Sequence, residues 1–276
     1  MSTPIGIPNF GNTCWLNSLI QGLLSSQQFI KCCNQLMEYK TPFVTKLLNL
    51  CYSCLNKSQA NTRMDMIQLL QSAGWHRGMP EDSSEALLWL IEQLHKECKV
   101  PMVLENETEN GIYTSIFKHN QGETSFIYSY FQGCYGWKTS DNEQRYEPFI
   151  TFYLDWAQIE NQTQNISQCL ETTFKNKQIV MMPPLLAICF DRTSEHIKFK
   201  CTSEFMLCTP EGKNVVYKLK AIILHIGSLA GGHYVCLGLR DNQWWIFDDD
   251  RVSQVEMTGL LNDVPRLCLY DMIVSN

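Results

Sequence analysis

Residues 9–24 read NFGNTCWLNSLIQGLL, a polar segment with one glycine that runs directly into an apolar repeat. The spacing of the repeat, with apolar side chains at i, i+3 and i+4, predicts a helix that buries one face. Its apolar members are Trp15, Leu16, Leu19, Ile20, Leu23 and Leu24. Thr13 is a suitable N-cap for this helix. Cys14 then lies in the first turn, where the positive end of the helix dipole favours a thiolate.

Outward from this segment, helical periodicity recurs over residues 44–55 and again over residues 84–96. After about residue 110 the pattern changes to short runs of β-branched and aromatic residues, separated by polar turns. We expect strands at Ser125–Phe131, Phe149–Leu154, Leu185–Phe190, Tyr217–His225, His233–Leu239 and Gln243–Phe247. Helices followed by strands predict an α+β domain instead of alternating βαβ units.

The composition argues against several classes of protein. The 276 residues, 45% of them hydrophobic, are enough for one large domain or two small ones. A formal charge of −6 and the lack of a basic run argue against a nucleic-acid partner. No apolar stretch is long enough to span a bilayer, so we expect no membrane partner. The thirteen cysteines are an odd number and no signal-peptide pattern precedes them, so we expect reduced, mostly buried cysteines inside a cell.

Two clusters near the end of the chain could supply partners for Cys14. His233 opens one expected strand, and Asp248 closes the next as the first of three consecutive acids. A turn at residues 241–242 would join these strands into an antiparallel hairpin and bring the two side chains together. The carboxylate could then orient an imidazole that deprotonates the thiol. Taken singly, each residue has a structural explanation, and His225 competes with His233 for the role of base.

Five segments, in the same order along the chain, resemble the ubiquitin-specific protease family of papain-like cysteine peptidases. They are the cysteine box at Gly6–Ser18, a relative of the Gln-Gln-Asp box at Glu81–Glu85, the strand at Met182–Arg192, the histidine box at Gly232–Asp249 and the closing strand at Pro265–Tyr270. The resemblance covers essentially the whole chain. It implies a single catalytic domain over residues 1–276, with a helical thumb to about residue 108 and β-rich fingers and palm from about residue 109 onward.

The resemblance also implies a role for each matching residue of the catalytic centre. Cys14 would be the nucleophile, His233 the general base and Asp248 the acid that orients the base. Asn9 would donate a hydrogen bond to the oxyanion, and Asp249 would support that site.

The same resemblance implies a narrow channel for the C-terminal tail of the substrate. The residues that would bind this tail are Asp82, Glu85, Gly231, Gly232 and Tyr234. Such a channel accepts two glycines before the scissile bond and excludes larger side chains. The implied substrate is ubiquitin, or a close ubiquitin-like protein, cut after its C-terminal glycine without a cofactor.

The chain departs from the family in its fingers. Two Cys-x-x-Cys pairs commonly bind a structural zinc there, but this chain has only Cys134 near the first pair and no cysteine in residues 175–182. Cys51 and Cys54 have the spacing of a ligand pair but lack a partner pair. We therefore predict shortened fingers and no metal.

Our first hypothesis is an active, monomeric deubiquitinase of the cytoplasm, with the nucleus or the cytoplasm of a virus-infected cell as further options. Glu81 and Thr193 replace a glutamine and an aromatic residue of the expected tail-binding surface. These changes leave open a peptidase for another ubiquitin-like modifier, or a catalytically weak ubiquitin-binding module. A cysteine-rich metal module is the third alternative.

Overall fold

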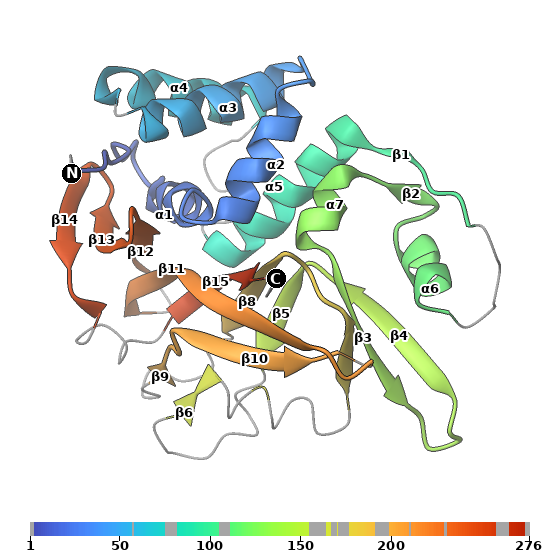
Figure 1. Ribbon diagram of the computed structural model, residues 1–276. Helices are drawn as coiled ribbons and strands as arrows, with labels where there is room; N and C mark the ends of the chain where they lie inside the picture. The colour runs from blue at the N-terminus through green and yellow to red at the C-terminus, as the bar shows by residue number, and fades with distance from the viewer. Residues whose placement is uncertain are drawn as a thin grey trace.

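The structure is a computed structural model that describes residues 3–56, 58–74, 82–104, 111–154, 164–166, 170, 177–190, 199–209, 211–228, 231–257 and 265–273. Helices from the first third of the chain lie above a large sheet, and smaller sheets lie beside and below it (Figure 1). No helix in these ranges is long and apolar enough to cross a membrane.

Five helices form the layer above the sheet. They are α1 (Cys14–Leu23), α2 (Gln27–Leu36), α3 (Pro42–Leu55), α4 (Gln59–Ser72) and α5 (Ser83–Cys98). The helices predicted near residues 15–24, 44–55 and 84–96 are confirmed, whereas α2 and α4 are additional. The buried face of α2 consists of Phe29, Cys32, Cys33 and Leu36. With cysteine counted as apolar this is helical spacing, so the sequence does carry a signal for α2.

The large sheet has eight strands in the order β14-β13-β12-β11-β15-β8-β5, with β10 also paired to β11. Its strands are β5 (Thr151–Leu154), β8 (Leu185–Phe190), β10 (Glu204–Cys208), β11 (Asn214–Ser228), β12 (Gly231–Arg240), β13 (Gln243–Asp248), β14 (Arg251–Val255) and β15 (Pro265–Ile273). All neighbours are antiparallel except β5 and β8, which are parallel. The strands predicted from residue 185 to residue 247 are therefore confirmed within slightly wider bounds.

The middle of the chain forms the smaller units. A three-stranded sheet has the order β4-β3-β7, and its β3–β4 hairpin projects at the lower right of Figure 1. The elements are β1 (Val100–Pro101), α6 (Ile112–His119), β2 (Glu123–Thr124), α7 (Phe126–Phe131), β3 (Gly133–Lys138), β4 (Gln144–Phe149), β6 (Gln164–Asn165), β7 (Gln178–Met181) and β9 (Phe199–Lys200). Two-stranded pairs join β1 with β2 and β6 with β9.

The strand predicted at Ser125–Phe131 is wrong, because residues 126–131 form helix α7. Its aromatic and β-branched residues favour a strand in isolation. Ile127 and Phe131, however, are four residues apart and fully buried, and the ring of Phe131 packs edge-on against Phe29 of α2 at 6.4 Å. Packing on the helical layer thus overrides local propensity.

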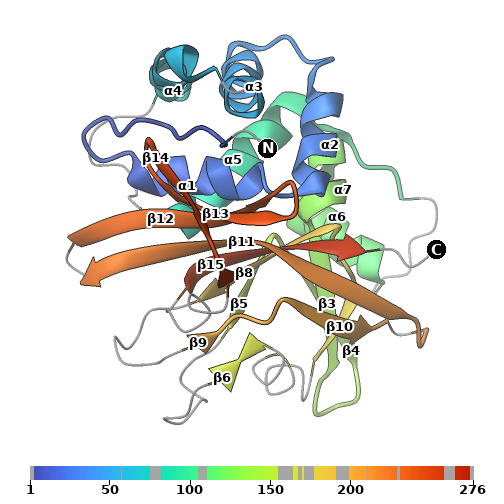
Figure 2. The ribbon, with the colours of Figure 1, turned by 60° about the vertical axis from the view of Figure 1, so that its left-hand side comes forward.

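An apolar core lies on each face of the large sheet, because successive strand residues point to opposite sides. The core under the helices includes Ala221, Ile223 and Cys236, and the opposite core includes Ile222 and Leu224. Helix α1 fills the first core so completely that all ten of its residues are buried. Figure 2 shows α1 lying across β12 and β13.

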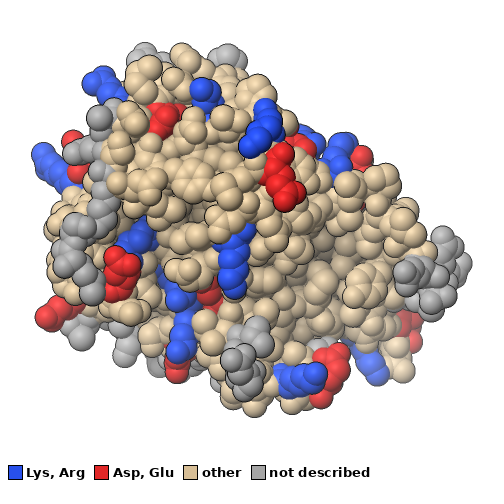
Figure 3. Space-filling view, turned by 45° about the horizontal axis from the view of Figure 1, so that its top comes forward, with Lys and Arg blue, Asp and Glu red and all other residues tan. Residues whose placement is uncertain are grey.

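The surface over the helical layer carries both signs of charge. Lysine, arginine and acidic side chains are scattered over a larger uncharged area on this face (Figure 3). Among the described residues no disulfide forms, and every described cysteine except Cys208 is buried. The cysteines therefore act mainly as small core residues, as the composition predicts.

Candidate active site

His233 and Asp248 meet at the open end of the β12–β13 hairpin. The strands pair antiparallel, and the turn residues Asp241 and Asn242 have φ angles of 50° and 61°. Two consecutive left-handed residues give the tight turn that matches the twist of the strands. At the other end of the hairpin, His233 Nε2 lies 2.5 Å from Asp248 Oδ1. The structure therefore brings His233 and Asp248 together, as expected from a turn at residues 241–242.

Cys14 is the first residue of α1 and is only 4% exposed. Thr13 stands at the N-cap position, but its hydroxyl oxygen accepts from the backbone N–H of Phe10 at 3.0 Å and does not cap the helix. Burial raises the pKa of the Cys14 thiol, an effect that the N–H of Tyr234 opposes and the charge of Asp249 strengthens. Burial is the largest of these influences, and it favours the uncharged thiol over the thiolate.

Cys14 and His233 lie close to each other in the fold, but they are not hydrogen-bonded. In the described part of the chain, no hydrogen bond joins Cys14 Sγ to the His233 imidazole. The backbone N–H that interacts with the thiol belongs to Tyr234, the residue after His233. The imidazole itself is 39% exposed, so part of the ring lies at the surface.

A half-buried arginine joins the other end of α1 to the same hairpin. Arg240, at the end of β12, donates from Nη2 to the backbone oxygen of Gln21 at 2.7 Å and from Nη1 to the hydroxyl of Ser25. Burial lowers its pKa to about 10. A cation at a helix C-terminus is favourable. Arg240 therefore fixes the helix that carries Cys14 relative to the strand that carries His233, a role that no spacing in the sequence predicts.

Asp249 binds one amide in the loop before Cys14, that of Asn9, and one on helix α1, that of Asn17. Asn9 Nδ2 donates to its Oδ2 at 2.9 Å, and Asn17 Nδ2 donates to its Oδ1 at 2.8 Å. Asn9 Oδ1 accepts in turn from the backbone N–H groups of Asn12 and Thr13, at 3.0 and 3.1 Å. The amide of Asn9 is thus oriented at both ends. Asn17 is a site residue that was not predicted, although a polar residue on an otherwise apolar helix is a usable signal.

The backbone of this loop lies directly against Asp249. Ile7 N donates to the Asp249 backbone oxygen at 2.9 Å. A Cβ on Gly6 would lie 2.2 Å from that oxygen, so only glycine fits. Gly11 and Asn12 follow with φ of 61° and 101°, which turns the chain toward the helix.

Asp82 is engaged within the protein. It is the N-cap of α5, where its Oδ1 accepts from the N–H groups of Ser84 and Glu85 at 2.8 and 3.2 Å. Its Oδ2 accepts from Tyr234 Oη at 2.9 Å and from Arg266 Nε at 2.7 Å. Burial acts to raise the pKa of Asp82, but the hydrogen bonds from Ser84 and Arg266 prevail and lower it. Its role in tail binding stays a prediction.

The other predicted tail residues lie around Asp82 and the start of β12. Gly231 and Gly232 are exposed, Glu85 is exposed on the first turn of α5, and Tyr234 is buried. His225 lies opposite Tyr234 on β11, with ring centroids 4.6 Å apart. His225 therefore packs beside Tyr234, whereas His233 is paired with a carboxylate.

Two substitutions relative to the family, Glu81 and Thr193, cannot be located in the site. Glu81 and Thr193 are both outside the described residues. The prediction of zinc-free fingers also stays a prediction. In the described ranges, the one group with three potential ligand atoms within 4.8 Å of one another is His233, Asp248 and Asp249. Its hydrogen bonds account for that proximity without an ion.

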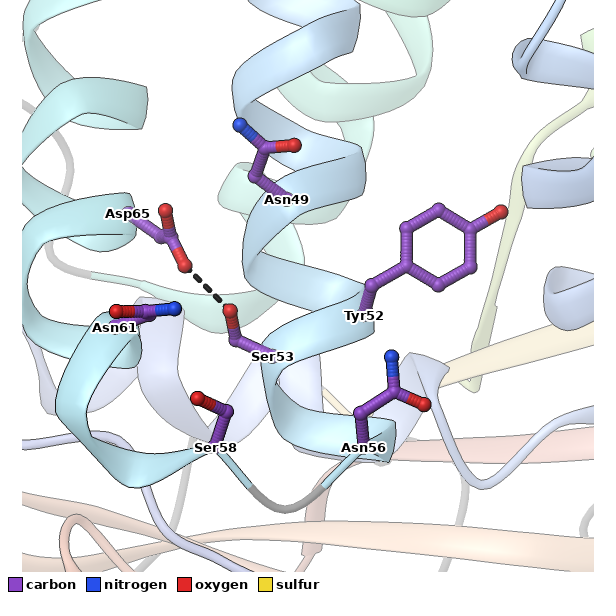
Figure 4. Close-up of a pocket in the computed structure, with 7 residues that line it drawn as sticks. All are labelled: Asn49, Tyr52, Ser53, Asn56, Ser58, Asn61 and Asp65. Atoms are coloured by element: carbon purple, nitrogen blue, oxygen red, sulfur yellow. Dashed lines mark hydrogen bonds between the residues drawn. The ribbon is translucent and has the colours of Figure 1, made fainter.

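A separate hollow, of about 300 Å³, lies between α3 and α4. Ser53 Oγ donates to Asp65 Oδ2 across it at 2.6 Å (Figure 4). The residues that line it are Asn49, Tyr52, Ser53, Asn56, Ser58, Asn61 and Asp65. None of them belongs to the site around Cys14.

Comparison with known proteins gives related sequences over almost the whole chain. The family model described as ubiquitin carboxyl-terminal hydrolase matches residues 5–270. Ubiquitin carboxyl-terminal hydrolase 23 of Arabidopsis thaliana is 22% identical over 306 residues, which cover 96% of this chain and 35% of that protein. Inactive ubiquitin carboxyl-terminal hydrolase 17-like protein 8 of Homo sapiens is 22% identical over 313 residues, which cover 96% of this chain and 55% of that protein. The chain thus spans less than two thirds of either relative.

Solved structures share the same architecture. The SAGA Ubp8/Sgf11/Sus1/Sgf73 DUB module matches with a TM-score of 0.78 at 20% identity, over 99% of this chain and 68% of that chain. That module has also been solved bound to monoubiquitin. These likenesses show the fold, which is α+β and papain-like as predicted. The match to the family model over residues 5–270 establishes that the chain belongs to the ubiquitin carboxyl-terminal hydrolase family.

Proposed function

We propose that this protein is a deubiquitinating thiol peptidase that hydrolyses the peptide or isopeptide bond after the C-terminal glycine of ubiquitin. The observation that carries the proposal is the 2.5 Å contact between His233 Nε2 and Asp248 Oδ1, beside a helix that begins with Cys14. Family membership supports the reaction class. A monomer in the cytoplasm is part of the same proposal.

The geometry supports a stepwise acyl transfer. Asp248 accepts the Nε2 proton of His233, which leaves Nδ1 as the basic nitrogen. Nδ1 takes the proton of Cys14, and the sulfur attacks the glycine carbonyl. Asn9, oriented by Asp249, donates to the negative oxygen of the tetrahedral intermediate. The leaving lysine amine receives the proton from His233, and water then releases the acyl group from sulfur.

The raised pKa of Cys14 predicts a distinctive pH profile for alkylation by iodoacetamide. The ordinary thiol pKa is 9.0 and the pKa of Cys14 lies above it. The reactive thiolate fraction therefore keeps increasing as the pH rises through 9.0. Mass spectrometry of the Cys14 peptide measures the rate, and exposed Cys208 gives a reference in the same sample. A plateau near neutral pH would instead indicate a preformed thiolate–imidazolium pair and contradict the expectation.

The proposal is tested with ubiquitin that carries a thiol-reactive group at its C-terminus, alongside matching ubiquitin-like probes. We expect one ubiquitin per chain, attached to Cys14 and absent in Cys14→Ala. Cys208→Ala is the matched control and should label normally. Labelling only by another modifier would redirect the substrate assignment.

The second candidate function is a ubiquitin-binding module with little turnover. The buried Cys14 thiol, whose pKa is raised and which has no hydrogen bond to His233, favours it, as does a relative whose name marks it inactive. Measurable ubiquitin binding without labelling by any probe would select this candidate over the peptidase.

A further inference from the structure

Arg266 occupies a bulge in β15. Leu267 pairs with Ile223 and Pro265 pairs with Leu224, so Arg266 has no partner residue on β11. A bulge of this kind locally bends the strand and re-aims a side chain, and bulges are common beside active sites. The irregularity here directs the guanidinium of Arg266 toward α5.

The guanidinium uses two of its three nitrogens within the protein. Nε donates to Asp82 Oδ2 at 2.7 Å, and Nη1 donates to the backbone oxygen of Phe190 at 2.7 Å. To the residues that the structure describes, Nη2 donates no hydrogen bond. The side chain of Arg266 is 19% exposed, so part of it faces solvent. Within the described part of the chain, Arg266 therefore keeps unused donors at an accessible edge.

This edge lies close to the catalytic centre. Asp82 Oδ2, which binds Arg266, also accepts from the hydroxyl of Tyr234, and the backbone N–H of Tyr234 interacts with the thiol of Cys14. Tyr153, 48% exposed on the edge strand β5, feels the charges of both Arg266 and Asp82. The guanidinium thus lies where α5 meets the large sheet.

The positive charge of Arg266, and its donors left unused by the described residues, favour a ligand that offers hydrogen-bond acceptors. Arg266 neutralises Asp82, whose oxygens already receive hydrogen bonds from Ser84, Glu85 and Tyr234. An extended peptide, in contrast, brings backbone carbonyl oxygens that need donors when water is excluded. A guanidinium offers them from a planar, preoriented fork and stays charged at every relevant pH.

We propose that Arg266 binds the backbone carbonyl oxygens of the substrate's extended C-terminal tail, and that Asp82 positions it. The inference rests on the proposed function, since it concerns how the same site holds its substrate. It assigns direct tail contact to Arg266 and a supporting role to Asp82.

The test measures ubiquitin binding in the Cys14→Ala background, where turnover cannot interfere. Arg266→Gln should weaken the Kd for intact ubiquitin about tenfold, the loss typical of one hydrogen bond to a charged group. Arg266→Lys can keep the ion pair to Asp82, but lysine has no second terminal nitrogen in the place of Nη2. This variant should therefore weaken ubiquitin binding similarly while retaining the fold. Arg145→Gln, on the exposed strand β4, is the matched control and should bind normally.

Ubiquitin without its C-terminal tail separates tail contact from a structural role. The Arg266→Gln variant and its parent should bind this tail-less ubiquitin with the same Kd. The proposal is overturned if Arg266→Gln leaves the Kd for intact ubiquitin within about twofold, or weakens both ligands by the same factor. Failure of the proposed function looks different: the Cys14→Ala parent would then not bind ubiquitin, and the protein with Cys14 intact would not react with any probe.

Discussion

Replacing His233 with alanine is expected to lower kcat/KM for a ubiquitin-based substrate by about 10,000-fold or more, as in other nucleophile–base pairs. Without the imidazole, the buried Cys14 thiol has no group to take its proton, and its raised pKa keeps it uncharged. Because nucleophile and base act as a unit, Cys14→Ala should cost about as much. Hydrolysis of ubiquitin joined to a fluorogenic leaving group measures both losses.

His225→Ala is the control for that experiment, because His225 is the competing candidate for the base. Its ring lies 4.6 Å from the ring of Tyr234, whereas His233 lies 2.5 Å from Asp248. We therefore expect His225→Ala to retain most of the activity, with any loss appearing in KM through Tyr234. An equal loss of kcat in both variants would refute the assignment of His233 as the base.

Asp249→Ala should produce the second largest effect, and it should act on stability and rate together. The bond from buried Asn17 to this carboxylate is worth about 2 kcal/mol of unfolding free energy, as for other hydrogen bonds to charged groups. The exposed bond from Asn9 adds less to stability. Asn9 would nevertheless lose its orientation, and losing an oxyanion donor costs about 100-fold in kcat or more. Chemical denaturation and steady-state kinetics measure the two losses.

Alkylation of Cys14 gives Asp249→Ala a signature that simple unfolding would lack. The charge of Asp249 helps to raise the pKa of Cys14. Its removal lowers that pKa, so iodoacetamide should react faster even as turnover falls. Asp250→Ala, at the exposed neighbouring position, should change neither quantity. Turnover within about twofold of the parent enzyme would show that Asp249 serves stability alone.

The hairpin of the candidate site could be predicted because its causes are local. Alternating strands and a turn at residues 241–242 are enough to place His233 beside Asp248. The clamp of Asn9 and Asn17 on Asp249 has no such local cause. It joins residues 240 and 232 positions apart in the chain, and no spacing rule links them.

Other features could not be predicted because they too depend on contacts between residues far apart in the sequence. Ser125–Phe131 has the composition of a strand, but contact with α2 and α5 makes most of it a helix. Asp82 matches a family residue that grips the substrate, and nothing in its surrounding sequence indicates its bond to Arg266. That bond depends on a bulge, and a bulge leaves little trace in the amino-acid pattern.

The hydrogen bonds from Asn9 and Asn17 to Asp249 also bear on when, during synthesis of the chain, the site can form. The ribosome makes α1 early, yet the strands β11, β12 and β13 that bury it follow much later in the sequence. Until those strands emerge, the ten buried residues of α1 have no sheet to cover them, and such a nascent chain is prone to aggregate or to need a chaperone. Asn9 likewise lacks its hydrogen-bond partner until Asp249, 240 residues further along the chain, has been synthesised. We therefore expect a nascent chain that stops before β11 to be catalytically silent, with activity beginning only after residues 214–249 have been made.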